Sequence, residues 1–203
     1  MEKSLVDTVK RSTGKFEFST LNLSKKELSK EALAEWYMNM VNLNKIAFDV
    51  IDSLGTFESA DIVRRLAVSL VNGIVGKWLT NAMATTMHER SHTEVYQKAG
   101  VKDYWYGTES TGEKKLSLGG LFVELLKSNS RGHANYIEHD DQPLSGKEKA
   151  AAAAAGINAN TLFAERIEND ALRAGKFHNA ETVHYLYNKL YSASYANSSI
   201  GSE

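Results

Sequence analysis

The sequence predicts a mainly α-helical fold with one minor β element. Its 203 residues contain a single proline, Pro143, so long stretches carry no residue that breaks a helix. Apolar residues in those stretches recur three or four positions apart, which is the spacing of one helix face. A chain of this length is expected to form one domain, which we place at residues 1–195, with a flexible tail at residues 196–203.

The first half of the chain is expected to hold one strand and two long helices. Residues 15–23 alternate weakly between apolar and polar side chains, which indicates an edge strand. A long amphipathic helix is expected at residues 24–55, because its start carries the Ser-x-x-Glu capping-box pattern. A second long helix is expected at residues 59–100. Its apolar stripe should face the core, and that stripe includes Ile74, Val75 and Trp78.

Beyond residue 100 the predicted elements become shorter. Residues 104–112 are rich in aromatic and turn-forming residues and predict an irregular hairpin, and residues 118–127 predict a short helix. Residues 128–146 read as a loop. Its side chains are polar enough to line a site, and they include His133, His139, Asp140 and Asp141.

The C-terminal part is expected to form three helices. The run of six alanines at residues 150–155 favours a helix that Gly156 ends. Two further helices are expected at residues 160–174 and 179–194, joined by a turn at Gly175.

Composition excludes several classes of function. The 24 basic and 25 acidic residues give a net charge of −1, so the positive field typical of nucleic-acid-binding proteins is missing. The absence of cysteine excludes disulfides, thiolate metal sites and a cysteine nucleophile. We expect no export signal, because residues 1–15 carry charges and no apolar core of signal-peptide length. We expect no membrane span, because the longest apolar-leaning stretch, residues 66–87, is interrupted by polar residues, while association with a membrane stays an open expectation. A cytoplasmic location is therefore the expectation.

One motif combines residues that can carry out a reaction. His88-Glu89-Arg90-Ser91-His92 has the pattern His-Glu-x-x-His near the end of the second long helix. Histidines four positions apart lie on one helix face, about 5 to 6 Å apart at Cβ, which is close enough to share a zinc ion. The glutamate between them can accept a proton from a water molecule that zinc activates.

The helical position of the motif favours a metal site over three unrelated side chains. At 100° per residue, His88, Glu89 and His92 fall within the stripe expected to face the core. Burying three ionisable groups together costs free energy unless something pairs them, and a metal ion does so.

On these five residues the chain resembles the gluzincin type of zinc metallopeptidase. The resemblance implies hydrolysis of peptide bonds in a peptide or protein substrate, with Glu89 as catalytic base and His88, His92 and a glutamate from a later helix as zinc ligands. Glu165, 73 residues after His92, is the expected third ligand, and Glu168 is the alternative. His184 is the expected donor to the developing oxyanion. Other candidates for that role are His178, Tyr185, Tyr104 and Tyr106.

Two other interpretations remain open. Glu89 and His92 also form a Glu-x-x-His motif, and Glu181 and His184 form a second one. Ferritin-like di-iron proteins use two such motifs, each with another glutamate on a neighbouring helix. The glutamates at suitable distances upstream are Glu58 and Glu148. Without a metal, the long amphipathic helices would fit a non-catalytic interaction protein.

Overall fold

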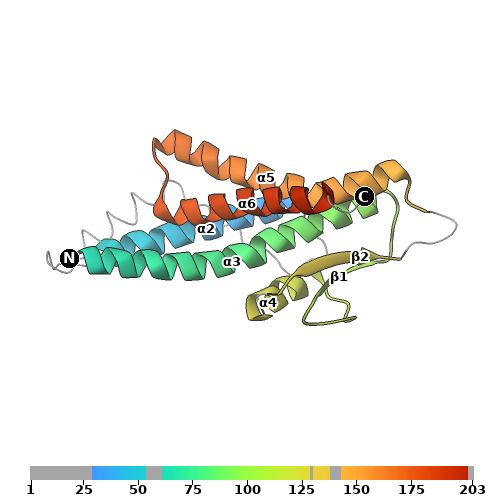
Figure 1. Cartoon of the computed structure of the whole chain (residues 1–203), viewed down its shortest axis with the longest axis horizontal. Helices are drawn as coiled ribbons and strands as arrows, with labels where there is room; N and C mark the ends of the chain where they lie inside the picture. Colours follow the sequence, from blue (N-terminus) through green and yellow to red (C-terminus); the bar gives the residue numbers. More distant parts are fainter. Residues whose placement is uncertain (1–28, 54–60, 129, 138–142, 201–203) are drawn as a thin grey trace.

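The computed structural model describes residues 29–53, 61–128, 130–137 and 143–200, and it is mainly helical with one small antiparallel sheet (Figure 1). Its elements in chain order are α2 (Lys30–Ser53), α3 (Asp61–Lys98), β1 (Tyr104–Thr108), α4 (Leu118–Ser128), β2 (Gly132–Tyr136), α5 (Gly146–Ala174) and α6 (Asn179–Ile200). The predicted fold class is therefore confirmed. The strand expected at residues 15–23 and the cap expected at Ser24 lie outside the described residues.

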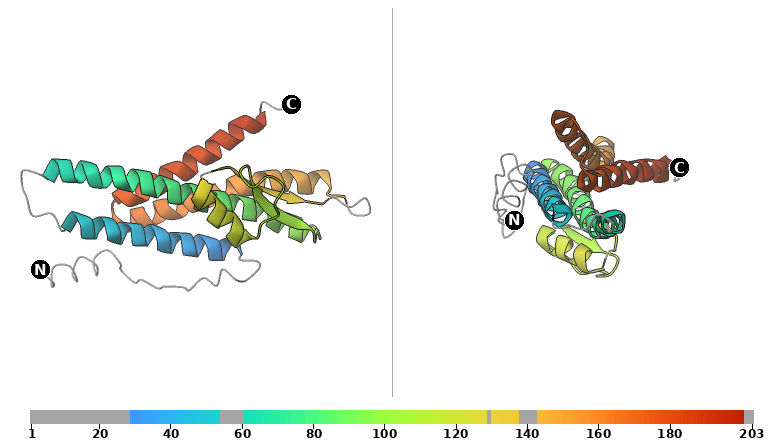
Figure 2. Two further views of the ribbon diagram at one scale, coloured as in Figure 1. Left: turned by 90° about the horizontal axis from the view of Figure 1, so that it is seen from below. Right: turned by 90° about the vertical axis from the view of Figure 1, so that its left-hand side faces the viewer.

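Helix α3 is the centre of the molecule. It contacts α2, α4, α5, α6 and both strands. In Figure 2 the helices α2, α5 and α6 surround it on one side, and α4 and the sheet cover the other side of its C-terminal half. Every residue from 82 to 91 is consequently buried, so this segment has no solvent-facing side.

The N-terminal half of α3 has a different environment, and one sequence prediction was wrong there. Ile74, Val75 and Trp78 were expected to face the core, but they are 62%, 49% and 43% exposed. A helix of 38 residues is longer than the elements that pack on it, so the same face is covered at one end and open at the other. Periodicity alone does not locate the change, because it reports the face of a helix and not its neighbours.

The segment expected to be a loop contains strand β2, so that expectation was wrong. β2 pairs with β1 in antiparallel register, with Tyr106 opposite Ala134. The N–H of Ile137 donates to the carbonyl of Asp103 (2.9 Å), just beyond one end of the strands. Since hydrogen-bonded and non-bonded pairs alternate along an antiparallel ladder, the backbone groups of Ala134 point away from β1. Pairing with β1 creates a strand here although Gly-His-Ala-Asn-Tyr is a weak strand sequence.

Helix α5 continues through the glycine that was expected to end it. Gly156 lies in the middle of the helix and is buried against α3. A capping box between Ser145 and Glu148 fixes the start of α5. Its end at Gly175 was predicted correctly, since Gly175 has φ 72° and its N–H bonds to helix carbonyls.

The core joins the four long helices. Tyr37 on α2 stacks on Phe163 of α5 with ring centroids 3.9 Å apart, and both side chains are buried. No helix in the described ranges is both long enough and apolar enough to cross a membrane.

Candidate metal-binding site

His88, Glu89 and His92 form the candidate site, as the motif predicted. One donor atom from each side chain lies within 4.8 Å of the other two. All three stand on the C-terminal half of α3, where His88 is fully buried and Glu89 is 3% exposed. Among the residues that the structure describes, no further histidine, aspartate or glutamate joins this group.

The backbone of α5 contacts both histidines. Nδ1 of His92 lies 2.5 Å from the carbonyl oxygen of Ala152. A carbonyl only accepts hydrogen bonds, so Nδ1 carries the proton and Nε2 keeps its lone pair. The His88 ring lies against Gly156, with its centroid 4.7 Å from that of His92 and 5.5 Å from that of Tyr191. Both imidazoles are therefore held by their surroundings.

Burial sets the charge of these groups. It lowers the pKa of His88 to about 3, with a smaller contribution from His92, while the Gly156 backbone opposes the shift. Burial also lowers the pKa of His92. Both rings are thus neutral near pH 7, which is the form that binds a metal.

The pKa of Glu89 is shifted in the opposite direction. Burial raises its pKa to about 7, and a hydrogen bond from the backbone N–H of Ala134 partly offsets this. Its carboxyl therefore exchanges a proton near neutral pH instead of near pH 4.

The three side chains could hold a metal ion, and the two imidazoles supply two of the three protein ligands that catalytic zinc sites have. Among the described residues, Glu89 is the only other such donor in the group. The bond from His92 Nδ1 to a backbone carbonyl is the type of outer contact that orients zinc-binding histidines.

A pocket of about 440 Å³ opens onto Glu89 and His92. Strand β2, the start of α5 and helix α3 form its walls. Its other lining residues are Tyr96, Gly132, His133, Ala134, Tyr136, Leu144, Lys149, Ala152 and Ala153. Glu89 and His92 on α3 are thus accessible from the strand side of the molecule.

Tyr96 is a site residue that the sequence interpretation missed. Its ring lies 4.6 Å from that of Tyr136, and both line the pocket. Burial raises the pKa of Tyr96, with further contributions from Tyr136 and Glu89, so its hydroxyl lies within electrostatic reach of the Glu89 carboxylate. The signal was present in the sequence, because Tyr96 follows His92 by four residues and shares its helix face.

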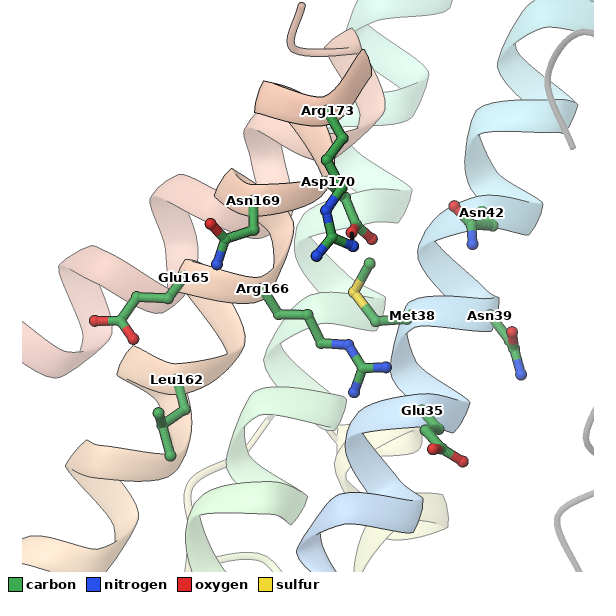
Figure 3. Close-up of a pocket in the computed structure, with 10 residues that line it drawn as sticks. All are labelled: Glu35, Met38, Asn39, Asn42, Leu162, Glu165, Arg166, Asn169, Asp170 and Arg173. Atoms are coloured by element: carbon green, nitrogen blue, oxygen red, sulfur yellow. Dashed lines mark ion pairs between the residues drawn. The ribbon is translucent and has the colours of Figure 1, made fainter. Parts of the chain in front are cut away.

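The expected third ligand is not brought to this group. Glu165 is exposed and lines a different pocket of about 710 Å³ between α2 and α5. Figure 3 shows Glu165 projecting from α5 away from α2, whereas Arg166 points toward α2. Glu165 follows Gly156 by nine residues, which is about 14 Å along the helix, and Glu168 lies farther still.

The expected oxyanion donor also lies elsewhere. Nδ1 of His184 is 2.6 Å from Oγ1 of Thr80, and Nε2 is 3.4 Å from Nδ2 of Asn44. Thr80 precedes His88 by eight residues, about 12 Å along α3. The fully buried His184 therefore belongs to the bundle core and not to the pocket at Glu89.

The other candidate donors also have partners or positions away from Glu89 and His92. His178 Nε2 lies 2.8 Å from Asp49, and the hydroxyl of Tyr106 lies 2.7 Å from Oγ1 of Thr93. The remaining two contact other rings, Tyr185 that of Phe177 and Tyr104 that of Tyr106.

The glutamates of the di-iron alternative are not assembled either. Glu181 is buried and accepts from Lys45 Nζ at 2.5 Å, while Glu148 caps α5. Since His184 lies far along α3 from His92, the two Glu-x-x-His motifs do not share one site. Glu58 lies outside the described residues.

Of the polar residues singled out around β2, His133 is one of those that line the pocket, and its ring lies over Gly107 of β1. His139, Asp140 and Asp141 lie outside the described residues.

Comparisons of this chain with protein-family models, with curated proteins and with solved structures found no match.

Proposed function

We propose that this protein is a zinc-dependent hydrolase that cleaves peptide bonds. The observation that carries the proposal is the grouping of His88, Glu89 and His92 within 4.8 Å, beside a pocket that the edge of β2 borders. His88 and His92 would hold the ion. Zinc bound there would polarise a carbonyl group and lower the pKa of a water molecule beside it.

Glu89 is assigned as the proton carrier. Its carboxylate takes a proton from the water whose oxygen attacks the peptide carbonyl carbon, and it delivers that proton to the nitrogen when the C–N bond breaks. The hydroxyl of Tyr96 supplies a hydrogen-bond donor in the same pocket for the carbonyl oxygen as it becomes negative.

The edge of β2 supports a peptide as the substrate class. The backbone groups of Gly132, Ala134 and Tyr136 point away from β1, and in the described part of the chain no third strand pairs with β2. The N–H of Ala134 already donates to Glu89, so an extended peptide would add to this edge through the remaining main-chain groups. Gly132 lies over α3, where an added Cβ would come 2.8 Å from Cγ2 of Thr85 and 3.5 Å from Cγ of Glu89, so a peptide at this edge would lie near the carboxylate.

Metal content is the first test of this proposal. Elemental analysis of the full chain after incubation with zinc and removal of excess should give about one zinc per chain. His88→Ala should lose that zinc. No bound metal in the wild-type chain would overturn the proposal.

The role of Glu89 is tested by Glu89→Gln. This variant should keep its zinc and lose hydrolysis of an unfolded protein substrate by at least about 100-fold, since Gln cannot carry the proton. Glu94→Gln is the matched control, because Glu94 is on the same helix and pairs with Lys30 and Arg90. Loss of zinc from Glu89→Gln would make Glu89 a ligand instead of the base, and unchanged hydrolysis would exclude both roles.

A further inference from the structure

The two histidines of the candidate site share a second, unassigned feature, which is their contact with the backbone of one neighbouring helix. His92 and His88 are four residues apart on α3, and the positions that they meet, Ala152 and Gly156, are four residues apart on α5. The order is reversed in space, as expected for antiparallel helices. The two histidines therefore contact α5 at points one helical turn apart.

The contact at Ala152 is a hydrogen bond from the His92 side chain to the main chain of α5. Nδ1 of His92 lies 2.5 Å from the carbonyl oxygen of Ala152, and the Ala152 side chain is 5% exposed. The helix backbone, and not an added polar side chain, provides the acceptor.

The contact at Gly156 leaves no room for a side chain. A Cβ at this position would lie 2.5 Å from both nitrogens of the His88 ring, closer than real Cβ contacts come. Glycine weakens a helix interior because it gives up more conformational freedom than alanine does. Close approach of the α5 backbone to His88 gives a physical reason for glycine at the middle of a long helix.

The alanine run next to Gly156 also allows the backbone of α5 to approach α3 closely. Residues 150–155 are all alanine, so no large side chain on this part of α5 holds it away from α3. The small residues let two helix backbones approach more closely than an ordinary apolar pair would.

From these contacts we infer that the backbone of α5 at Ala152 and Gly156 is a positioning element for the metal site, which fixes the place of the His88 ring and holds His92 so that its Nε2 is presented to the ion. This inference rests on the proposed metal site but makes a separate claim. A hydrogen bond to a carbonyl fixes which nitrogen carries the proton, and such outer contacts contribute 10- to 100-fold to metal affinity. Simple close packing would not select a tautomer.

The tautomer of His92 tests the inference without any metal. Long-range ¹H–¹⁵N correlation spectra of the metal-free full chain near neutral pH should show His92 as the Nδ1–H tautomer. The Nε2–H tautomer, which predominates in free neutral histidine, would overturn the inference. Because this measurement uses wild-type protein, it does not depend on any variant folding.

Gly156→Ala tests the close approach. Cobalt(II) titration should show binding weakened by about 10- to 100-fold, with an altered visible spectrum, because the new Cβ displaces His88. Gly73→Ala is the matched control, since Gly73 is also within a helix and an added Cβ there meets nothing within 4 Å. Thermal unfolding of both variants, measured without metal, shows that the fold is kept.

The outcomes separate the two proposals. Wild-type cobalt affinity and spectrum in Gly156→Ala would overturn the positioning role and leave the metal site standing. No cobalt binding in the wild-type chain would overturn the proposed function and, with it, the positioning role, whatever the tautomer of His92.

Discussion

Two opposing influences act on the pKa of the Glu89 carboxyl group. It is 3% exposed on a helix that neighbours enclose, and burial raises its pKa to about 7. The N–H of Ala134 stabilises the ionised form and limits that rise. A cation held by the adjacent histidines would lower the pKa further, because an opposite charge favours the carboxylate. The ionisation of Glu89 therefore depends on what the site holds.

His184 allows a stability prediction away from the candidate metal site. Burial lowers its pKa to about 4, so the folded protein keeps it neutral while the unfolded chain binds a proton below its ordinary pKa of 6.5. The contribution of neutral His184 to the free energy of unfolding is fully present above about pH 6.5. It is lost as the pH falls toward 4, and the total loss is about 3 kcal/mol.

The measurement is urea unfolding of the wild type and of His184→Gln at about pH 7 and about pH 4.5. The wild type should lose more stability between these pH values than the variant. Thr80 and Asn44, the groups next to the two ring nitrogens, do not titrate in this range, so the difference reports His184 itself. Equal losses in the two proteins would contradict the prediction.

At the scale of elements, replacing a glycine by alanine has opposite effects on stability inside a helix and at its end. Gly175 ends α5 with φ 72°, a conformation that costs other residues about 1 to 2 kcal/mol. Gly73 lies within α3 with open space around its Cα, where alanine gains up to about 1 kcal/mol of helix propensity. Gly175→Ala should therefore destabilise the protein and Gly73→Ala should stabilise it.

Chemical denaturation of these two variants shows directly whether each substitution raises or lowers the free energy of unfolding. A stabilising effect of Gly175→Ala would mean that α5 does not end in the left-handed conformation. A destabilising effect of Gly73→Ala would mean that something contacts that position of α3.

Helix α3 shows how one element carries two environments. Its N-terminal half exposes Ile74 and Trp78, and its C-terminal half is buried from residue 82 to residue 91. Arg90 is accommodated in the buried half by hydrogen bonds to Thr93 (3.0 Å) and Gln97 (3.1 Å). The residues that could hold a metal ion therefore lie in the buried half of the helix.

At the scale of the whole molecule, stability should depend on the stacked rings that connect α2 and α5. Phe163 is 1% exposed and stacks on Tyr37, whereas its neighbour Leu162 is 57% exposed. Phe163→Ala should cost about 3 to 5 kcal/mol because it leaves a cavity. Leu162→Ala should change stability by less than about 0.5 kcal/mol.

Urea unfolding of both variants checks this pair. The two substitutions are adjacent on one helix and both leave alanine, so their helix propensities differ by less than about 0.7 kcal/mol, which is small beside the expected difference. Similar costs would show that the stack of Phe163 on Tyr37 is not central to the fold.

The sequence by itself determined the features that depend on local spacing. The mainly helical class, the approximate ranges of α2, α3 and α4 and the turn at Gly175 all follow from helix periodicity and helix-ending residues. The grouping of His88 with His92 was predicted for the same reason, since a helix brings residues four apart together.

Only the tertiary structure decided the features that depend on distant parts of the chain. β2 is a strand because β1 pairs with it, and α5 runs through Gly156 because that glycine packs on His88. The positions of Glu165 and His184 away from the site follow from where α5 and α6 cross α3. Sequence spacing fixes distances within one helix, but the contacts between helices depend on side-chain packing over the whole molecule.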